Sequence, residues 1–187
     1  VEKCSRTATV TAASDVTLLV LSASKFENFM SDAPPSLLHA VRQHVDYALS
    51  GIVRKIPFFK DIKDVGVLAS MFHMKNYEEG YVIFREGEQG TAFYIIIEGE
   101  CCVTKLNDAS ETELLATLKK GDFFGEVALL RQSKRSATIT CSTRCRLLIL
   151  ASTEFTRFLS IAPELKQTLN RHVQNISKGL HSDSPGY

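Results

Sequence analysis

The sequence has no tryptophan, no excess of either charge and no long apolar run. Its 187 residues include 22 Lys+Arg and 21 Asp+Glu, which gives a formal net charge of +1. Proteins that bind nucleic acid through their overall charge are strongly basic, so we expect no nucleic-acid partner. No apolar stretch approaches the roughly 20 residues that a membrane-spanning helix requires, so we expect no membrane span. Hydrophobic residues make up 44% of the chain, which excludes a disordered protein and allows a sizeable core.

Features that would mark a secreted protein are missing. The chain starts at Val1 without a methionine or the apolar segment of a signal peptide, and we expect it to be a fragment of a longer protein. Five cysteines are present, an odd number without Cys-x-x-Cys spacing, and the five histidines do not cluster with them along the sequence: Cys4, Cys101, Cys102, Cys141 and Cys145. Because a zinc site needs four converging ligands, we expect free thiols, a cytoplasmic location and no metal site.

The sequence contains an internal repeat. The six residues from Arg6 (Arg-Thr-Ala-Thr-Val-Thr) resemble the six from Arg135 (Arg-Ser-Ala-Thr-Ile-Thr), and the match continues at an offset of 129 through residues 18–21 and 147–150. We therefore expect residues 1–50 to be the C-terminal part of a first module, ending in a linking helix over about Pro35 to Arg54. Residues 51–187 would be a complete second module. Residues 1–30 would contain two strands without a barrel, so their apolar side chains would need another cover, such as a dimer contact.

The residue pattern of the second module changes twice along the chain. Residues 52–72 have helical spacing, interrupted at Pro57. From residue 77 to 150, short segments rich in β-forming residues recur about every 8–12 residues, which is typical of an antiparallel barrel or jelly roll. Residues 136–141 and 146–150 are expected to form a hairpin, and helices are expected over 154–159 and from Pro163 to about Leu180. The predicted fold class is therefore α+β, an antiparallel jelly-roll-like β-barrel flanked by N-terminal and C-terminal helices.

The segment 121–138 carries the clearest chemical signal. Gly125 and Glu126 precede a short helix-favouring stretch, so free backbone N–H groups would face whatever lies in front of it. Arg135 follows nine residues after Glu126 and offers a planar fork of donors that suits two phosphate oxygens. A carboxylate beside phosphate donors makes sense if the ligand also carries a hydroxyl, as a sugar phosphate does. The alternatives are a simple helix cap at Gly125-Glu126 and an ordinary surface arginine at Arg135. Five basic residues without an acid between Arg131 and Arg146 fit either an anion site or a solvated strand edge.

This segment resembles the phosphate-binding cassette of cyclic-nucleotide-binding domains. The family pattern appears as Gly125-Glu126-Val127-Ala128-Leu129, five further residues, and then Arg135-Ser136-Ala137-Thr138. The upstream residues 80–99 match the family as well, so that the resemblance covers about 52–180. The duplication resembles the tandem arrangement in the regulatory regions of cyclic-nucleotide-dependent protein kinases. Lys134 stands where the family usually has proline, and Thr91 where an aspartate is common.

The resemblance implies a role for each residue of the cassette. Glu126 would accept a hydrogen bond from the ribose 2′-OH, and Arg135 would pair with the cyclic phosphate. Gly125 would permit the turn, and further donors would be the backbone N–H groups of Val127, Ala128 and Ala137. In this family a hydroxyl after the arginine tends to accompany cGMP, so Ser136 favours cGMP over cAMP, unless it only fills a slot for a small residue.

The resemblance also implies how the module would act. The helix over 154–159 would be a hinge, and the last helix a lid over the base. Four residues on one face of that helix are lid candidates, although core packing of this stripe is as good an interpretation: His172, Val173, Ile176 and Leu180. The expected function is a regulatory switch that needs no cofactor beyond its ligand, is not an enzyme, and acts on a protein kinase catalytic domain in cis or in trans. The alternatives are a degenerate module that only docks a partner, and a barrel enzyme of the cupin type.

Overall fold

The computed structural model describes residues 9–62, 65–107 and 109–177. The chain divides into two compact units, residues 1–47 and residues 48–187, and the first has little regular structure before its helices. Residues 9–22 form neither helix nor strand, and α1 (Ala23–Ser31) begins where the Ser22 side chain accepts a hydrogen bond from the backbone N–H of Lys25. Helix α2 (Pro35–Val53) follows and confirms that a helix covers the range predicted as about Pro35 to Arg54. Arg6 and Thr7 lie outside the described residues.

The prediction of two strands within residues 1–30 is wrong for the part that the structure describes. Strands are stable only when neighbouring strands satisfy their backbone hydrogen bonds, and no strand in the described part of the chain pairs with residues 9–22. Apolar residues of the segment are more than half exposed: Val10, Val16, Leu18, Leu19, Val20 and Leu21.

The second unit is built on two four-stranded antiparallel sheets, in the orders β1-β8-β3-β6 and β2-β7-β4-β5. The strands of the first sheet are β1 (His73–Tyr77), β8 (Cys145–Ala151), β3 (Ala92–Glu98) and β6 (Phe123–Phe124). Those of the second are β2 (Val82–Phe84), β7 (Thr138–Cys141), β4 (Cys101–Leu106) and β5 (Thr112–Leu118). The second unit is thus an α+β, jelly-roll-like fold, as predicted.

Strands β7 and β8 are correctly located by the sequence but do not form the predicted hairpin. Strand β7 pairs with β2 and β4, whereas β8 pairs with β1 and β3 in the other sheet. The turn between them carries the chain across the barrel from one sheet to the other. Alternation of apolar residues reveals that a segment is a strand, but it does not reveal its partners.

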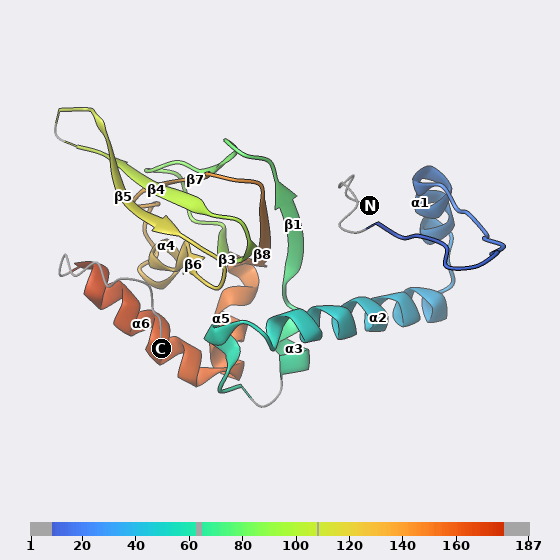
Figure 1. The fold of residues 1–187 in the computed structure, drawn as a ribbon. Coiled ribbons are helices and arrows are strands. Elements are labelled where there is room, and N and C mark those ends of the chain that lie inside the picture. Colours follow the sequence, from blue (N-terminus) through green and yellow to red (C-terminus); the bar gives the residue numbers. More distant parts are fainter. Residues whose placement is uncertain (1–8, 63–64, 108, 178–187) are drawn as a thin grey trace. The chain divides into compact units, whose positions relative to one another are not determined.

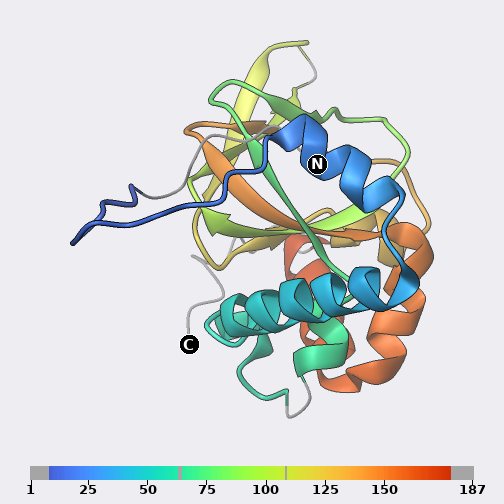
Figure 2. The same ribbon diagram turned by 90° about the vertical axis from the view of Figure 1, so that its right-hand side faces the viewer.

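The helices of the second unit gather on one side of the barrel in both views (Figure 1 and Figure 2). After α2, the short 3₁₀ helix η1 (Pro57–Phe59) and α3 (Val65–Ala69) confirm the predicted break at Pro57. Helix α4 (Glu126–Leu130) lies within the cassette segment, and α5 (Ser152–Ile161) and α6 (Pro163–Ser177) follow the last strand. No helix in the described part of the chain is long and apolar enough to cross a membrane.

Two apolar cores flank the sheet that contains β3 and β8. Alternate residues of β3 point to opposite faces, so Phe93 and Ile95 pack against the helices, while Tyr94 and Ile96 fill the barrel interior. The helical core joins α5 and α6 to the barrel, and the barrel core lies beneath the cassette. The cassette is therefore held between a rigid sheet and the C-terminal helices.

Candidate functional site

Gly125 links the short strand β6 to helix α4 in a conformation that favours glycine. Its φ is +88°, in the left-handed region. A Cβ at this position would lie 2.7 Å from Nη1 of Arg135 and 3.0 Å from the carbonyl oxygen of Ala92. A side chain here would therefore be strained by the backbone and would also push Arg135 away.

Arg135 returns to this glycine because the end of the cassette pairs with the segment after β2. The backbone N–H of Arg135 donates to the Glu88 carbonyl at 2.8 Å, and its own carbonyl accepts from the Gly87 N–H at 2.9 Å. The side chain then reaches inward and is only 4% exposed. The sequence predicted this residue as a ligand for phosphate, and the structure buries it beside the start of α4.

The guanidinium of Arg135 is held by neutral groups. Nη1 donates to the carbonyl of Gly125 and Nη2 to the carbonyl of Ala92, each at 2.7 Å. Its Cζ lies 3.9 Å from the centroid of the Phe84 ring, a cation–π contact. Within the described chain, Nε has no hydrogen-bond partner.

Burial lowers the pKa of Arg135, and Tyr94, Glu126 and Glu88 counteract part of that effect. A buried cation that donates only to neutral carbonyls is incompletely compensated. An anion that accepts from the remaining N–H would supply a charge-assisted hydrogen bond in an environment of low polarity.

Glu126 is the first residue of α4 and is only 2% exposed. Burial raises the pKa of its carboxyl group to about 7, although its own backbone N–H and Arg135 both act in the opposite direction. Its Oε1 lies 3.6 Å from Nε2 of His172 on α6. Burial lowers the pKa of His172, with Asp122 opposing, so near pH 7 neither group carries its charge readily.

The lid candidates on α6 separate into inward and outward positions. His172 is partly buried and meets the Phe123 ring edge-on, with centroids 5.0 Å apart. Val173 is buried, whereas Ile176 is exposed. Leu180 lies outside the described residues. The interpretation of this stripe as packing surface therefore fits Val173, while His172 contacts the candidate site itself.

The other predicted site residues lie around Glu126 and Arg135 at different depths. Val127 and Ala137 are half-buried, Ala128 is buried, and Ser136 is exposed. The Ala128 Cβ occupies the place next to Gly90, where an added Cβ would lie only 2.6 Å away. The structure thus brings Gly125, Glu126 and Arg135 together and leaves the Ser136 hydroxyl at the surface.

The sequence did not predict three groups that position Arg135. These are the carbonyl of Ala92 and the rings of Phe84 and Tyr94. Phe84 and Tyr94 stand in the two strand motifs that resemble the family, but they were interpreted only as strand residues. For Tyr94, its alternation with Phe93 and Ile95, which face the helical core, was the available signal.

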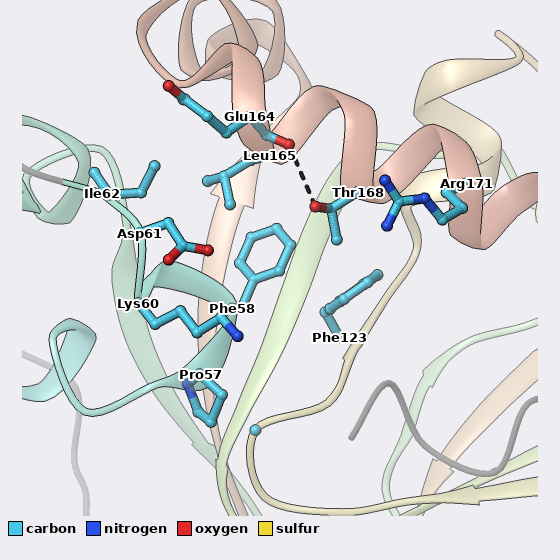
Figure 3. Close-up of a pocket in the computed structure, with 11 residues that line it drawn as sticks. Pro57, Phe58, Lys60, Asp61, Ile62, Phe123, Glu164, Leu165, Thr168 and Arg171 are labelled. Atoms are coloured by element: carbon cyan, nitrogen blue, oxygen red, sulfur yellow. Dashed lines mark hydrogen bonds between the residues drawn. The ribbon is translucent and has the colours of Figure 1, made fainter. Parts of the chain in front are cut away.

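A separate cavity of about 270 Å³ lies between η1, the turn at Gly121 and helix α6. Figure 3 shows Phe58 and Phe123 on its walls, with Thr168 donating a hydrogen bond to the carbonyl of Glu164 at 3.3 Å. None of the residues predicted to bind the ligand lines this cavity. It is therefore distinct from the surroundings of Glu126 and Arg135.

Comparisons with known proteins agree with this geometry. Residues 74–161 match the family described as "Cyclic nucleotide-binding domain". The chain is 35% identical over 156 residues to the cAMP-dependent protein kinase regulatory subunit of Yarrowia lipolytica, covering 82% of this chain and 39% of that protein. It is 27% identical over 179 residues to human cGMP-dependent protein kinase 2, covering 94% of this chain and 22% of that protein. The chain thus spans well under half the length of these relatives.

Two solved structures are similar to this chain over most of its length. One is described as "Sp-2Cl-cAMPS bound to PKAR CBD2", with a TM-score of 0.64 and 30% identity, covering 73% of this chain and 90% of that one. The other is described as "cAMP bound PfPKA-R (141-441)", with a TM-score of 0.66 and 29% identity, covering 81% of this chain and 50% of that one.

Proposed function

We propose that this chain, in which a cyclic nucleotide-binding domain is present over residues 74–161, is a regulatory module that binds a cyclic nucleotide through Arg135 and Glu126. The observation that carries the proposal is the buried guanidinium of Arg135, whose Nε–H lacks a partner in the described structure. A cyclic phosphate would accept from this group and compensate its charge. The relatives named as cAMP- or cGMP-dependent support the same ligand class.

Each remaining residue of the cassette has a proposed part in binding. Glu126 accepts a hydrogen bond from the ribose 2′-OH, and Gly125 gives the backbone its left-handed turn. The backbone N–H groups of Val127, Ala128 and Ala137 add neutral donors to the phosphate. The carboxylate would thus accept a hydrogen bond from the sugar, and the guanidinium would neutralise the phosphate of the same ligand.

We propose cGMP as the preferred nucleotide. Ser136 follows Arg135 directly and is exposed, so its hydroxyl is free to accept a hydrogen bond from the guanine 2-amino group. Relatives named for cAMP and for cGMP both resemble this chain, so the preference rests on Ser136 alone.

Binding would act by changing the position of the C-terminal helices. His172 lies against the carboxyl group of Glu126, and a ribose hydroxyl bound to that carboxyl group would compete with this contact. A ligand that binds better when α6 has moved shifts the population toward the moved state. The proposed effector is a protein kinase catalytic domain, in the same polypeptide or in a partner. The chain itself would be regulatory and not an enzyme.

We also propose that residues 1–50 are the C-terminal part of a first module, with α2 as the link to the second. The alignment with human cGMP-dependent protein kinase 2 extends over 94% of this chain, well beyond residues 74–161, which supports this proposal. The exposed apolar residues of 10–21 fit a surface that the rest of that module, or a second copy of the chain, would cover. Free thiols at Cys101, Cys102, Cys141 and Cys145 fit a cytoplasmic location.

Calorimetric titration of the whole chain with cAMP and cGMP tests this function. We expect Arg135→Ala to weaken binding roughly 10- to 100-fold, because it removes a charge-assisted hydrogen bond. The matched control is Arg157→Ala, which removes an exposed arginine paired with Glu154 on the same helix. Unchanged affinity in Arg135→Ala would refute the assignment, and a parent chain that binds neither nucleotide would favour a module that only docks a partner.

A 2′-deoxy nucleotide tests the role of Glu126 separately. Glu126→Gln should weaken binding of the parent nucleotide, and the 2′-deoxy ligand should then lose nothing further. If removing the 2′-OH weakens nucleotide binding by the same factor in Glu126→Gln as in wild type, another group recognises the hydroxyl.

A further inference from the structure

Three cysteines from three different strands converge at one end of the barrel. Cys101 begins β4, Cys141 ends β7 and Cys145 begins β8. Their three Sγ atoms all lie within 4.8 Å of one another, and Sγ of Cys101 is 3.7 Å from Sγ of Cys145. We call Cys101, Cys141 and Cys145 the cysteine cluster. All three thiols are free, and each residue is at most 1% exposed.

The crossing of the chain between the two sheets creates this arrangement. Cys101 and Cys141 are directly paired across β4 and β7 in one sheet, while Cys145 stands on β8 in the other. Gly99 leaves the space that the third thiol occupies. Its φ is +89°, and a Cβ there would lie 2.8 Å from Sγ of Cys145 and 2.4 Å from the carbonyl oxygen of Arg144.

The distance between one pair of sulfur atoms is that of thiolates sharing one ion. With metal–sulfur bonds of about 2.3 Å and tetrahedral angles, two thiolates on one ion lie about 3.8 Å apart, close to the 3.7 Å between Cys101 and Cys145. In the part of the chain that the structure describes, no histidine or carboxylate joins the three thiols. The cluster therefore offers three sulfur ligands and lacks the fourth protein ligand of a structural zinc site.

The surroundings of the cluster decide which charge it can accommodate. The three cysteines belong to the same buried apolar group as Ile139 and Leu147. The Cys145 thiol lies within hydrogen-bond distance of two neutral carbonyls, those of Glu100 at 3.2 Å and Thr143 at 3.3 Å. Three thiolates around a monovalent or divalent ion would leave a net negative charge in this apolar interior, which is costly. A trivalent centre with three thiolates is neutral.

We propose that Cys101, Cys141 and Cys145 form a three-thiolate binding site for a thiophilic trivalent centre, for which arsenite is the probe. Soft thiolate ligands select soft ions, and three-coordinate trivalent arsenic requires no fourth ligand. Binding replaces the three hydroxyl groups of As(OH)₃ by three sulfur atoms. Three As–O bonds break, three As–S bonds form, and the three thiol protons leave with the hydroxyl groups as three waters, without any change of oxidation state.

The cluster lies beneath a turn at the surface of the barrel. The residues between Cys141 and Cys145 form this turn, and Thr143 and Arg144 in it are exposed. Because each cysteine is at most 1% exposed, arsenite would have to enter through an opening of this turn, and as uncharged As(OH)₃ it would bring no charge into the apolar interior.

The experiment uses the 187-residue chain with Cys4→Ser and Cys102→Ser, so that only the cysteine cluster remains, in a phosphine reductant that contains no thiol. Native mass spectrometry after addition of arsenite should show one arsenic per folded chain, with the loss of three hydrogens. Restoring Cys102, which is half-buried and contacts the Ser142 hydroxyl at 2.8 Å, should change neither stoichiometry nor affinity. Each of Cys101→Ser, Cys141→Ser and Cys145→Ser should weaken retention roughly 100-fold, because one link of the chelate is lost.

The melting temperature keeps the proposal testable even where a serine variant fails to fold. Arsenite should raise the melting temperature of the chain with the intact cluster, because it binds the folded state. A lowered melting temperature would show capture of unfolded thiols and would overturn the proposal. The proposal also fails if no arsenic is retained, if a variant with two cluster cysteines retains it equally well, or if zinc displaces arsenite at equal concentration.

Discussion

Replacing Glu126 by glutamine should stabilise the protein without ligand, and the gain should depend on pH in a direction that the structure fixes. The carboxyl group is almost fully buried, and burial raises its pKa from 4.5 to about 7. Glutamine has nearly the same shape but cannot ionise. The substitution therefore removes the cost of a buried charge and leaves the packing at the start of α4 largely intact.

The magnitude follows from the two pKa values. Because the folded chain holds its proton more tightly than the unfolded chain, wild-type protein gains stability as the pH falls from about 7 toward 4.5, and it is destabilised above that range. The full effect amounts to about 3 kcal/mol, since a pKa difference of one corresponds to about 1.4 kcal/mol. Between pH 8 and pH 5.5, the stability advantage of Glu126→Gln over wild type should shrink by about 2 kcal/mol.

Urea denaturation of both proteins at pH 8 and pH 5.5 measures this change. Burial lowers the pKa of His172, so this residue makes wild type lose stability as the pH falls below about 6.5. His172 is present in both proteins but lies 3.6 Å from Glu126, so the substitution changes its surroundings. The comparison is therefore repeated in a His172→Gln background, in which only the Glu126 carboxyl group differs. Glu113→Gln, which changes an exposed carboxylate on β5, is the matched control and should show no pH-dependent advantage.

An advantage of Glu126→Gln that is equal at both pH values would refute the reasoning, because the carboxyl group would then not titrate differently in the folded chain. If the prediction holds and the same variant binds nucleotide more weakly, Glu126 is an example of a residue kept for function at a cost in stability.

Three further substitutions test other contacts. Gly99→Ala should lower the free energy of unfolding by more than about 2 kcal/mol, because it combines a left-handed backbone with a clash. Gly87→Ala, with a φ of +83° and nothing within 4 Å of the added Cβ, should cost only about 1 kcal/mol, and equal losses in urea denaturation would contradict the clash. Gly125→Ala should displace Arg135 and abolish most nucleotide binding in calorimetry, whereas Gly80→Ala, with a φ of +78° and nothing within 4 Å of the added Cβ, should leave it unchanged. Phe84→Leu should cost about 0.5–2 kcal/mol through the lost cation–π contact, and a double-mutant cycle with Arg135→Lys that shows no coupling would refute this.

The local sequence determined much of the proposed site. The spacing from Gly125-Glu126 to Arg135 indicated a turn, a short helix and a returning arginine, and the structure has α4 with Gly125 in the left-handed region. Pro57 marked a helix break, and the linking helix α2 follows its predicted range within one residue. These features depend on neighbouring residues and on the rigid geometry of glycine and proline, so they can be derived without a tertiary structure.

Tertiary structure alone decided which distant segments meet. The strands β7 and β8 were predicted as partners but lie in different sheets, because a strand's alternation gives its two faces and not its neighbours. Residues 9–22 did not become strands, because no described strand of the chain forms hydrogen bonds with them.

Tertiary structure also decided the buried contacts that the sequence did not predict. The carbonyl of Ala92 holds Arg135, His172 reaches Glu126, and three cysteines join into a cluster. Ala92 and Arg135, Glu126 and His172, and Cys101 and Cys145 are each more than 40 residues apart and share no common local pattern. The sequence by itself set the chemistry of the cassette, whereas the packing of two sheets and two C-terminal helices decided which charges are buried, and burial is what changes their pKa values.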